Sequence, residues 1–369
     1  GPDTIVTSNT STIPISLLTQ GMPQEFCERF AITHFFNPVR FMRLLELVRG
    51  EHTRDDVIIT LDQFCESKLG KGVVVCEDTP GFLGNRVGVF AIQCALHTAF
   101  NMGLSPAEAD ALFGRPMGIP KTGVFGLYDL IGIDLMADVA KSLESILPAG
   151  DEFHQYAKPI PLMTQMVANG QTGNKGGQGF YRDTDAGREV LNLASGEYTP
   201  TTRLQLTLAQ QAEAEGVAVL LDEDSAYGRF AWQVLSSTLN YAASLIPEIG
   251  SNILPIDDAM KLGYNWIYGP FELLDQIGAQ RVVDRMQKEG RSVAPMLLLA
   301  AKKQGFYQVI DQQLCSLDES GDYAVIKRPD GVLRFSELRQ TLTPEFSNAK
   351  ASWFVHDNAA IVEFHSKAN

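Results

Sequence analysis

A ten-residue pattern that occurs twice constrains the fold of this chain more than any other feature. Residues 123–132 read GVFGLYDLIG and residues 269–278 read GPFELLDQIG, with glycine, phenylalanine, leucine, aspartate and isoleucine at matching positions. An internal repeat of this kind indicates two copies of one structural module. We expect the repeated aspartates, Asp129 and Asp275, to act in helix packing or capping.

The sequence around both copies is typical of helices. Residues 82–102 form a mostly apolar stretch rich in alanine and valine, and residues 207–219 resume a helical pattern. The run Ser105-Pro106-Ala107-Glu108 combines a serine cap, a first-turn proline and a glutamate at the third helical position, which together mark a helix start. The expected all-α domains are residues 80–182 and 203–310, with a polar linker over residues 183–202.

The first part of the chain has a different pattern. Residues 31–33, 44–48 and 72–76 read as strands, and residues 54–69 read as an amphipathic helix. These elements form the closing half of an α/β unit. In open α/β sheets ligands bind outside the carboxyl ends of the strands, so polar residues that follow these apolar runs are candidates for a shared site.

Composition excludes several classes of function. A formal net charge of -14 argues against general nucleic-acid binding, which needs a basic surface. No apolar run is long enough to span a bilayer. The five cysteines are scattered and form no C-x-x-C pair, which favours a reducing intracellular compartment and argues against a zinc site.

Polar side chains gather at the edges of the apolar runs in the first 86 residues. A hydroxyl, an imidazole, a carboxylate and a carboxamide arranged in this way can form a general acid/base site with donors that polarise a carbonyl group. The segments are residues 7–12 (TSNTST), 33–38 (THFFNP), 45–48 (LELV) and 78–86 (DTPGFLGNR).

Each of these residues also has a purely structural interpretation. A lone histidine beside aromatic residues is more often a core residue than a catalyst. Ser11 lies in a run with good turn chemistry, and Asn85, just after Pro80-Gly81, suits a helix cap. Taken together, the segments favour a catalytic site.

The same segments, in this order, resemble the 3-hydroxyacyl-CoA dehydrogenase family over residues 5–306. The resemblance implies that His34 is the general base or acid at the C3 oxygen of the substrate, and that Glu46 orients it. It further implies that Ser11 and Asn85 hydrogen-bond the substrate. In the second copy of the repeat module, Gly228 replaces this asparagine, so we expect that copy to be structural.

The family oxidises 3-hydroxyacyl-CoA to 3-oxoacyl-CoA with NAD, so the resemblance implies an acyl-CoA substrate and a role in fatty-acid β-oxidation. Asn9 and Asn37 match positions near the nicotinamide end of NAD. The resemblance also implies a thiolase partner, a homo-oligomer, and a location in the bacterial cytoplasm, or in mitochondria or peroxisomes of a eukaryote. Basic residues near the site suit coenzyme A phosphates or a solvated mixed-charge face equally well: Arg40, Arg43, Arg49, Lys68 and Lys71.

One expected motif is missing. A pyrophosphate-binding βαβ unit carries G-x-G-x-x-G after a strand, and this sequence has none; the glycines of residues 81–84 and 173–179 have other spacings. We therefore expect residues 1–79 to be the second half of a Rossmann-type domain, in a fragment that lacks the first half. Such a fragment is expected to have negligible dehydrogenase activity.

The end of the chain has a character of its own. Residues 322–348 are polar and rich in turn residues, and residues 359–369 (AAIVEFHSKAN) are similar to the opening strand of enoyl-CoA hydratase/isomerase, or crotonase-fold, domains. We expect residues 322–369 to be a linker that leads into such a domain, as in multifunctional β-oxidation enzymes. The other interpretation of these last residues is a frayed terminal strand.

Three other functions compete with this one. Sugar-acid and hydroxyisobutyrate dehydrogenases use a catalytic lysine in a different motif. A non-catalytic scaffold or CoA-binding helical module is compatible with the missing nucleotide half. A hydratase would rest on the short C-terminal similarity alone. Acyl-chain length preference and oligomeric state do not follow from the sequence.

Overall fold

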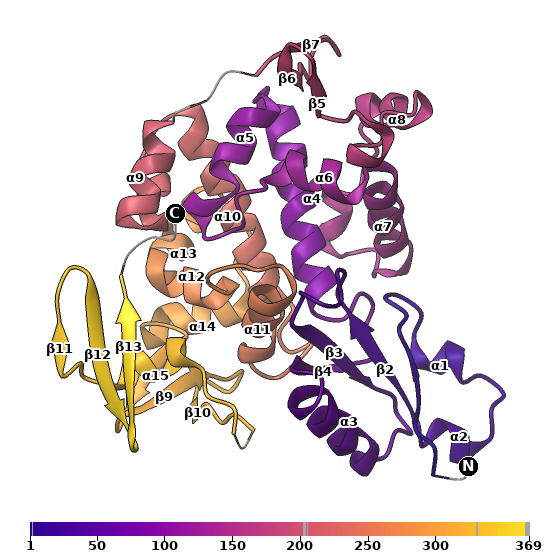
Figure 1. Ribbon diagram of the computed structural model, residues 1–369, viewed down its shortest axis with the longest axis vertical. Helices are drawn as coiled ribbons and strands as arrows, with labels where there is room; N and C mark the ends of the chain where they lie inside the picture. The colour runs from indigo at the N-terminus through magenta and orange to yellow at the C-terminus, as the bar shows by residue number, and fades with distance from the viewer. Residues whose placement is uncertain (2, 202–203, 205, 330, 366–369) are drawn as a thin grey trace.

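A four-stranded mixed sheet forms the first part of the protein (Figure 1). The computed structural model describes every residue except 2, 202, 203, 205, 330 and 366–369. Strands β1 and β2 are parallel, β2 and β3 are antiparallel, and β3 and β4 are parallel. The three strands predicted from apolar runs are confirmed. The bounds are β1 (Val6–Ser8), β2 (Phe30–Phe35), β3 (Leu44–Arg49) and β4 (Gly72–Glu77).

Helices from two distant parts of the chain pack on this sheet. The predicted amphipathic helix is α3 (Asp55–Ser67), which contacts β2, β3 and β4. Helix α11 (Leu254–Gly263) also contacts β3 and β4. The approach is close, because a Cβ on Gly72 would lie 2.5 Å from Leu262. Two short helices, α1 (Ile15–Leu18) and α2 (Gln24–Cys27), connect β1 to β2.

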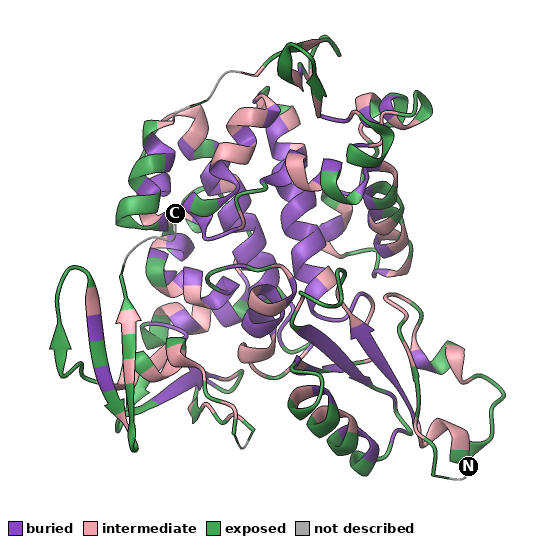
Figure 2. Ribbon diagram, in the orientation of Figure 1, coloured by how far each residue is buried: buried purple, intermediate pink, exposed green. Residues whose placement is uncertain are grey.

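Two helical units follow the sheet, and their longest helices pack against each other at the centre of the molecule, where burial is greatest (Figures 1 and 2). The first helical unit contains α4 (Gly84–Met102), α5 (Pro106–Leu112), α6 (Val124–Ile131), α7 (Ile133–Ile146) and α8 (Pro161–Ala168). The second helical unit contains α9 (Thr207–Glu215), α10 (Ala226–Ser244), α11, α12 (Pro270–Ile277), α13 (Ala279–Lys288) and α14 (Pro295–Lys303).

The helix start predicted at Ser105 is confirmed in detail. Its hydroxyl accepts a hydrogen bond from the backbone N–H of Glu108, and the Glu108 carboxylate accepts one from the backbone N–H of Ser105. This capping box satisfies two N–H groups that the first turn of α5 would otherwise leave unpaired.

The repeated aspartates make the same contacts in both helical units. Asp129 accepts hydrogen bonds from the backbone N–H groups of Phe180 and Tyr181, both at 2.8 Å. Asp275 accepts from Phe306 and Tyr307 at 2.7 and 2.8 Å. Each aspartate therefore ties its helix to the start of a following strand, which is a packing role and not a helix cap.

The glycine-rich run of residues 173–179 is explained by the same contact. Gly179 lies against the Asp129 carboxylate so closely that a Cβ there would be 1.9 Å from Oδ1. Gly173 meets the backbone of Asp129 in the same way, with a Cβ position 2.5 Å from its carbonyl oxygen. These glycines allow close packing within the first helical unit.

The polar stretch predicted to be a linker over residues 183–202 contains strands of a small three-stranded sheet, and that prediction was wrong. Arg182 pairs with Glu189 across two antiparallel strands at 2.6 Å, and Leu191 is buried. A small sheet with one buried apolar residue and paired polar side chains is hard to recognise from a polar sequence. Its strands are β5 (Tyr181–Thr184), β6 (Gly187–Leu191) and β7 (Tyr198–Pro200). Residue 202, the last of the predicted linker, and residue 203, the first of the predicted second all-α domain, lie outside the described residues.

The end of the chain also contains more regular structure than a linker. Strand β10 (Tyr323–Val325) pairs with β9 (Gln313–Leu317), which pairs with β8 (Tyr307–Ile310), so this sheet extends the second helical unit. After α15 (Phe335–Thr341), a separate antiparallel sheet contains the crotonase-like stretch as β13. The four residues 366–369 of that stretch lie outside the described part of the chain. This sheet consists of β11 (Phe346–Ser347), β12 (Ala351–His356) and β13 (Ala359–Phe364).

Within the described residues, none of the helices combines the length and the apolar character needed to cross a bilayer.

Arg86, in the first turn of α4, connects the two helical units. Its buried guanidinium pairs with Asp151 at 2.7 Å and with Glu248 at 2.8 Å, and it donates to the hydroxyl of Tyr241 at 3.1 Å. Desolvation lowers the pKa of Arg86, but its anionic and hydroxyl partners outweigh that effect and raise the pKa above its ordinary value. The start of α4 is therefore anchored to the second helical unit.

We expect Arg86→Met to lower the free energy of unfolding by about 3 kcal/mol, because the variant leaves the buried Asp151 carboxylate without its positively charged partner. Arg229 is the matched control: it is the arginine at the corresponding place of the second repeat, and its ion pair with Asp224 is exposed. Arg229→Met is expected to cost less than about 1 kcal/mol. Urea denaturation of the three proteins measures both values, and equal losses would contradict the role given to Arg86.

Candidate active site

The antiparallel pairing of β2 with β3 creates the centre of the site. In this register His34 lies directly opposite Glu46. The two side chains meet, with 2.6 Å between His34 Nδ1 and Glu46 Oε2. Both are buried, at 5% and 0% exposure. The histidine and the carboxylate predicted to act together are therefore in direct contact.

The Glu46 carboxylate has two further donors. Its Oε1 accepts hydrogen bonds from the backbone N–H groups of Leu83 and Gly84, at 3.0 and 2.7 Å. These N–H groups belong to the start of α4, where free amides and the helix dipole favour a negative charge. Gly84 is required here by space, because a Cβ would lie 2.8 Å from the Phe36 ring.

These contacts define the protonation pattern of His34. An ionised carboxylate only accepts hydrogen bonds, so Nδ1 carries the proton that Glu46 accepts. In the neutral ring Nε2 is then a bare acceptor, and no described residue hydrogen-bonds to it. Phe36 and Phe82 flank the ring, with centroids 4.8 and 5.7 Å away. The alternative interpretation, a satisfied core histidine, therefore accounts for only one of the two ring nitrogens.

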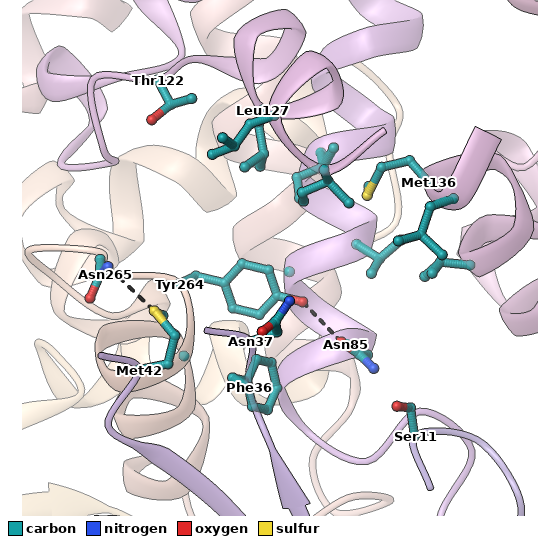
Figure 3. A pocket seen from close by; sticks show the side chains of 18 of the residues that line it. Ser11, Phe36, Asn37, Met42, Asn85, Thr122, Leu127, Met136, Tyr264 and Asn265 are labelled. Atoms are coloured by element: carbon teal, nitrogen blue, oxygen red, sulfur yellow. Dashed lines mark hydrogen bonds between the residues drawn. The ribbon is translucent and has the colours of Figure 1, made fainter. Parts of the chain in front are cut away.

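A cavity of about 760 Å³ opens beside His34. His34 of β2 lines it together with Ser11, Asn37 and Asn85. The last three side chains come from the loop after β1, the loop after β2 and the first turn of α4 (Figure 3). The remaining wall is largely apolar and comes from α6, α7 and the loop after α11. It includes Leu127, Leu130, Ile131, Leu135, Met136 and Val139.

The structure does not show the helix cap considered for Asn85, and the Ser11 side chain takes no part in the hydrogen bonds of its own turn. Hydrogen bonds within the turn after β1 are accepted by Ser8 and Thr10, whereas the Ser11 hydroxyl bonds to no described residue. The N-cap of α4 is Leu83, so the Asn85 side chain does not cap the helix. Both polar groups lie at the cavity wall with capacity to contact a ligand.

The two asparagines predicted near NAD have different surroundings. Asn37 lines the cavity just beyond the end of β2. Asn9 follows the end of the parallel strand β1, where its Oδ1 accepts a hydrogen bond from the backbone N–H of Phe35 at 2.9 Å. Asn9 therefore fixes the two strand ends relative to each other, and it is not among the residues that line the cavity.

Some of the predicted basic residues have structural partners. Lys71 donates to the carbonyl oxygens of Val39 and Met42, which holds the loop after β2 in place. Arg49 forms an ion pair with Asp55. These contacts agree with the structural or solvated-face interpretation of these two side chains.

Sequence reasoning missed the contribution of the second helical unit. Gly263, Tyr264, Asn265 and Trp266 line the cavity, and the Tyr264 hydroxyl donates to Asn85 Oδ1 at 3.0 Å (Figure 3). Burial, with the Glu46 charge nearby, raises the pKa of Tyr264, so the phenol stays protonated. No motif marks these residues, because they lie between the end of a helix and the second repeat.

Comparison with known proteins identifies the family of the chain. Residues 1–79 match the family model described as the NAD binding domain of 3-hydroxyacyl-CoA dehydrogenase, and residues 81–183 match the C-terminal domain of the same enzyme. The chain belongs to the 3-hydroxyacyl-CoA dehydrogenase family.

Relatives include much longer proteins. A putative fatty acid oxidation complex trifunctional enzyme of Rickettsia prowazekii is 40% identical over 74% of this chain and 38% of its own length. A probable 3-hydroxyacyl-CoA dehydrogenase of Bacillus subtilis is 33% identical over 99% of this chain and 47% of its own length. The chain thus spans less than half of either protein.

A solved structure supports the fold. The crystal structure of 3-hydroxybutyryl-CoA dehydrogenase from Escherichia coli superposes with a TM-score of 0.60 and 23% sequence identity. The match covers 82% of this chain and 76% of the other. The coverage extends beyond the first helical unit, so most of the arrangement in Figure 1 is shared with that enzyme.

The contacts of Glu46 predict the tautomer of His34. In Glu46→Gln the carbonyl oxygen is expected to keep the two backbone donors, so the side-chain NH₂ group faces His34 Nδ1. The imidazole must then accept at Nδ1 and carry its proton on Nε2. Ring ¹⁵N chemical shifts of neutral His34 in histidine-labelled protein should show Nδ1–H in the wild type and Nε2–H in the variant.

The exposed carboxylate of Glu77, on neighbouring strand β4, provides the control for this measurement. Glu77→Gln should leave the ¹⁵N pattern unchanged. The same tautomer in wild type and Glu46→Gln would contradict the hydrogen-bond assignment.

Proposed function

We propose that this chain carries the catalytic residues of an NAD-dependent 3-hydroxyacyl-CoA dehydrogenase, which oxidises 3-hydroxyacyl-CoA to 3-oxoacyl-CoA. The observation that carries the proposal is the pairing of His34 with Glu46 beside a cavity that Ser11 and Asn85 also line. Membership of the family supplies the reaction class, and the paired histidine and carboxylate supply the acid/base chemistry that this reaction needs.

In the proposed reaction the C3 hydroxyl donates its proton to Nε2 of His34 while a hydride leaves C3 and the carbonyl group forms. Glu46 stabilises the resulting imidazolium without moving, because its carboxylate is already held by His34 and two backbone N–H groups. General-base assistance of this kind contributes roughly 10² to 10⁴-fold in rate. In the reverse direction the imidazolium returns the proton to the C3 oxygen.

Asn85 and Ser11 are proposed to bind the polar part of the substrate. Their side chains lie at the cavity wall and can donate hydrogen bonds to the C3 oxygen or to the thioester carbonyl. Such donors stabilise the charge that develops on oxygen during hydride transfer. The apolar side chains of α6 and α7 offer a surface for the acyl chain, since burial of its methylene groups is favourable.

NAD supplies the ring carbon that accepts the hydride. We infer that Asn37, which lines the cavity, and Asn9, which joins the ends of β1 and β2, would hold its nicotinamide end when NAD is bound. The sequence has no G-x-G-x-x-G loop for the pyrophosphate. We therefore infer that these 369 residues alone turn over NADH much more slowly than the full-length gene product.

We also infer that the second helical unit is a second copy of the family's C-terminal domain. The matching contacts of Asp129 and Asp275 support this inference. The name of the Rickettsia relative, a trifunctional enzyme of fatty acid oxidation, supports a role within a β-oxidation multienzyme. We propose that a hydratase/isomerase activity and a thiolase act with the dehydrogenase there, in the cytoplasm of a bacterium.

His34→Ala in the full-length gene product should lower the rate of NADH oxidation with acetoacetyl-CoA by roughly 10² to 10⁴-fold, because the proton donor is lost. His52, an exposed histidine in the turn after β3, provides the control, and His52→Ala should keep wild-type turnover. A spectrophotometric assay of NADH absorbance measures the rate for all three proteins.

Wild-type turnover in His34→Ala would refute the catalytic role of this residue. An inactive wild-type protein that still binds acetoacetyl-CoA would instead favour the rival function, a non-catalytic CoA-binding scaffold.

A further inference from the structure

The ring of Tyr264 occupies a slot between the sheet and α4. It meets the edge of the Phe36 ring, with centroids 5.8 Å apart and planes at 67°. On the other side it covers Gly88, where a Cβ would lie 2.2 Å from the tyrosine ring. The absence of a side chain on Gly88 therefore leaves the space that the Tyr264 ring needs against α4.

The Tyr264 hydroxyl has one described partner, Asn85 Oδ1, at 3.0 Å. The phenol is protonated and donates this hydrogen bond, so the oxygen of the carboxamide faces the tyrosine. The NH₂ group is then directed away from the ring (Figure 3). Because Asn85 lines the cavity, this orientation decides whether a donor or an acceptor faces the substrate.

We propose that Tyr264 is a positioning residue that fixes the Asn85 carboxamide with its NH₂ group available to the C3 oxygen, so that the second helical unit completes the active site. This inference rests on the proposed dehydrogenase function. It extends that function, because the second unit had been expected to be only structural.

The neighbouring contacts argue for a specific role. Arg86, the residue next to Asn85, is tied to the second helical unit through Tyr241 and Glu248. The backbone of Asn85 is thus anchored by one set of contacts and its side chain is oriented by another. A side chain that only filled space between the units would need no hydroxyl, since phenylalanine has the same ring.

Tyr264→Phe retains the ring and removes only the donor. In the full-length gene product we expect kcat with acetoacetyl-CoA to fall about tenfold, the effect of losing one hydrogen bond, with the KM for NADH unchanged. Tyr307→Phe is the matched control. It removes a hydroxyl of the same unit that donates to Asp257, neither residue lines the cavity, and the variant should keep wild-type kcat.

A double-mutant cycle separates positioning from general stability. If Tyr264 acts through Asn85, then Tyr264→Phe should have no further effect on kcat in an Asn85→Ala protein. The same tenfold loss in both backgrounds would overturn the inference, and so would wild-type kcat in Tyr264→Phe alone. Thermal unfolding of each variant confirms that the folded fraction is equal.

Failure of the proposed function has a different signature. It would appear as absence of His34-dependent turnover in the same assay, and it would overturn this inference as well. Failure of the inference alone leaves His34-dependent turnover intact while Tyr264→Phe behaves like the wild type.

Discussion

The rest of the site depends on the buried carboxylate of Glu46. One of its oxygens accepts from His34 and the other accepts from the first amides of α4, so a single side chain joins β2, β3 and α4. A buried charge is stable only when its hydrogen-bonding capacity is satisfied, and here all three donors are supplied by the fold. This arrangement sets the tautomer of His34. It also holds Gly84, the residue before Asn85, against the carboxylate that bonds to His34.

The second helical unit has a larger part in the site than its sequence suggests. It supplies the tyrosine that contacts Asn85, residues that line the cavity, and two partners of Arg86, Tyr241 and Glu248. Its internal contacts around Asp275 repeat those around Asp129. The two helical units therefore share these internal contacts but differ in their surface residues. Surface residues of the second unit face the cavity beside His34.

The sequence was sufficient for features that depend on neighbouring residues or on strand periodicity. The strands of the sheet, helix α3 and the capping box at Ser105 follow from local chemistry, and the family resemblance identified His34 and Glu46. Contacts between distant segments were beyond sequence reasoning: Tyr264 and Asn85 are 179 residues apart, and Arg86 and Tyr241 are 155 apart. The strands of residues 181–200 were missed because their stability comes from a few pairings across strands.

A crystal structure of the full-length gene product with acetoacetyl-CoA bound would test the central claim most directly. The account predicts that the C3 oxygen lies within about 3 Å of both His34 Nε2 and Asn85 Nδ2, with the acyl chain against α6 and α7. A substrate bound in this cavity with its C3 oxygen out of reach of His34, or a substrate bound elsewhere on the protein, would contradict it.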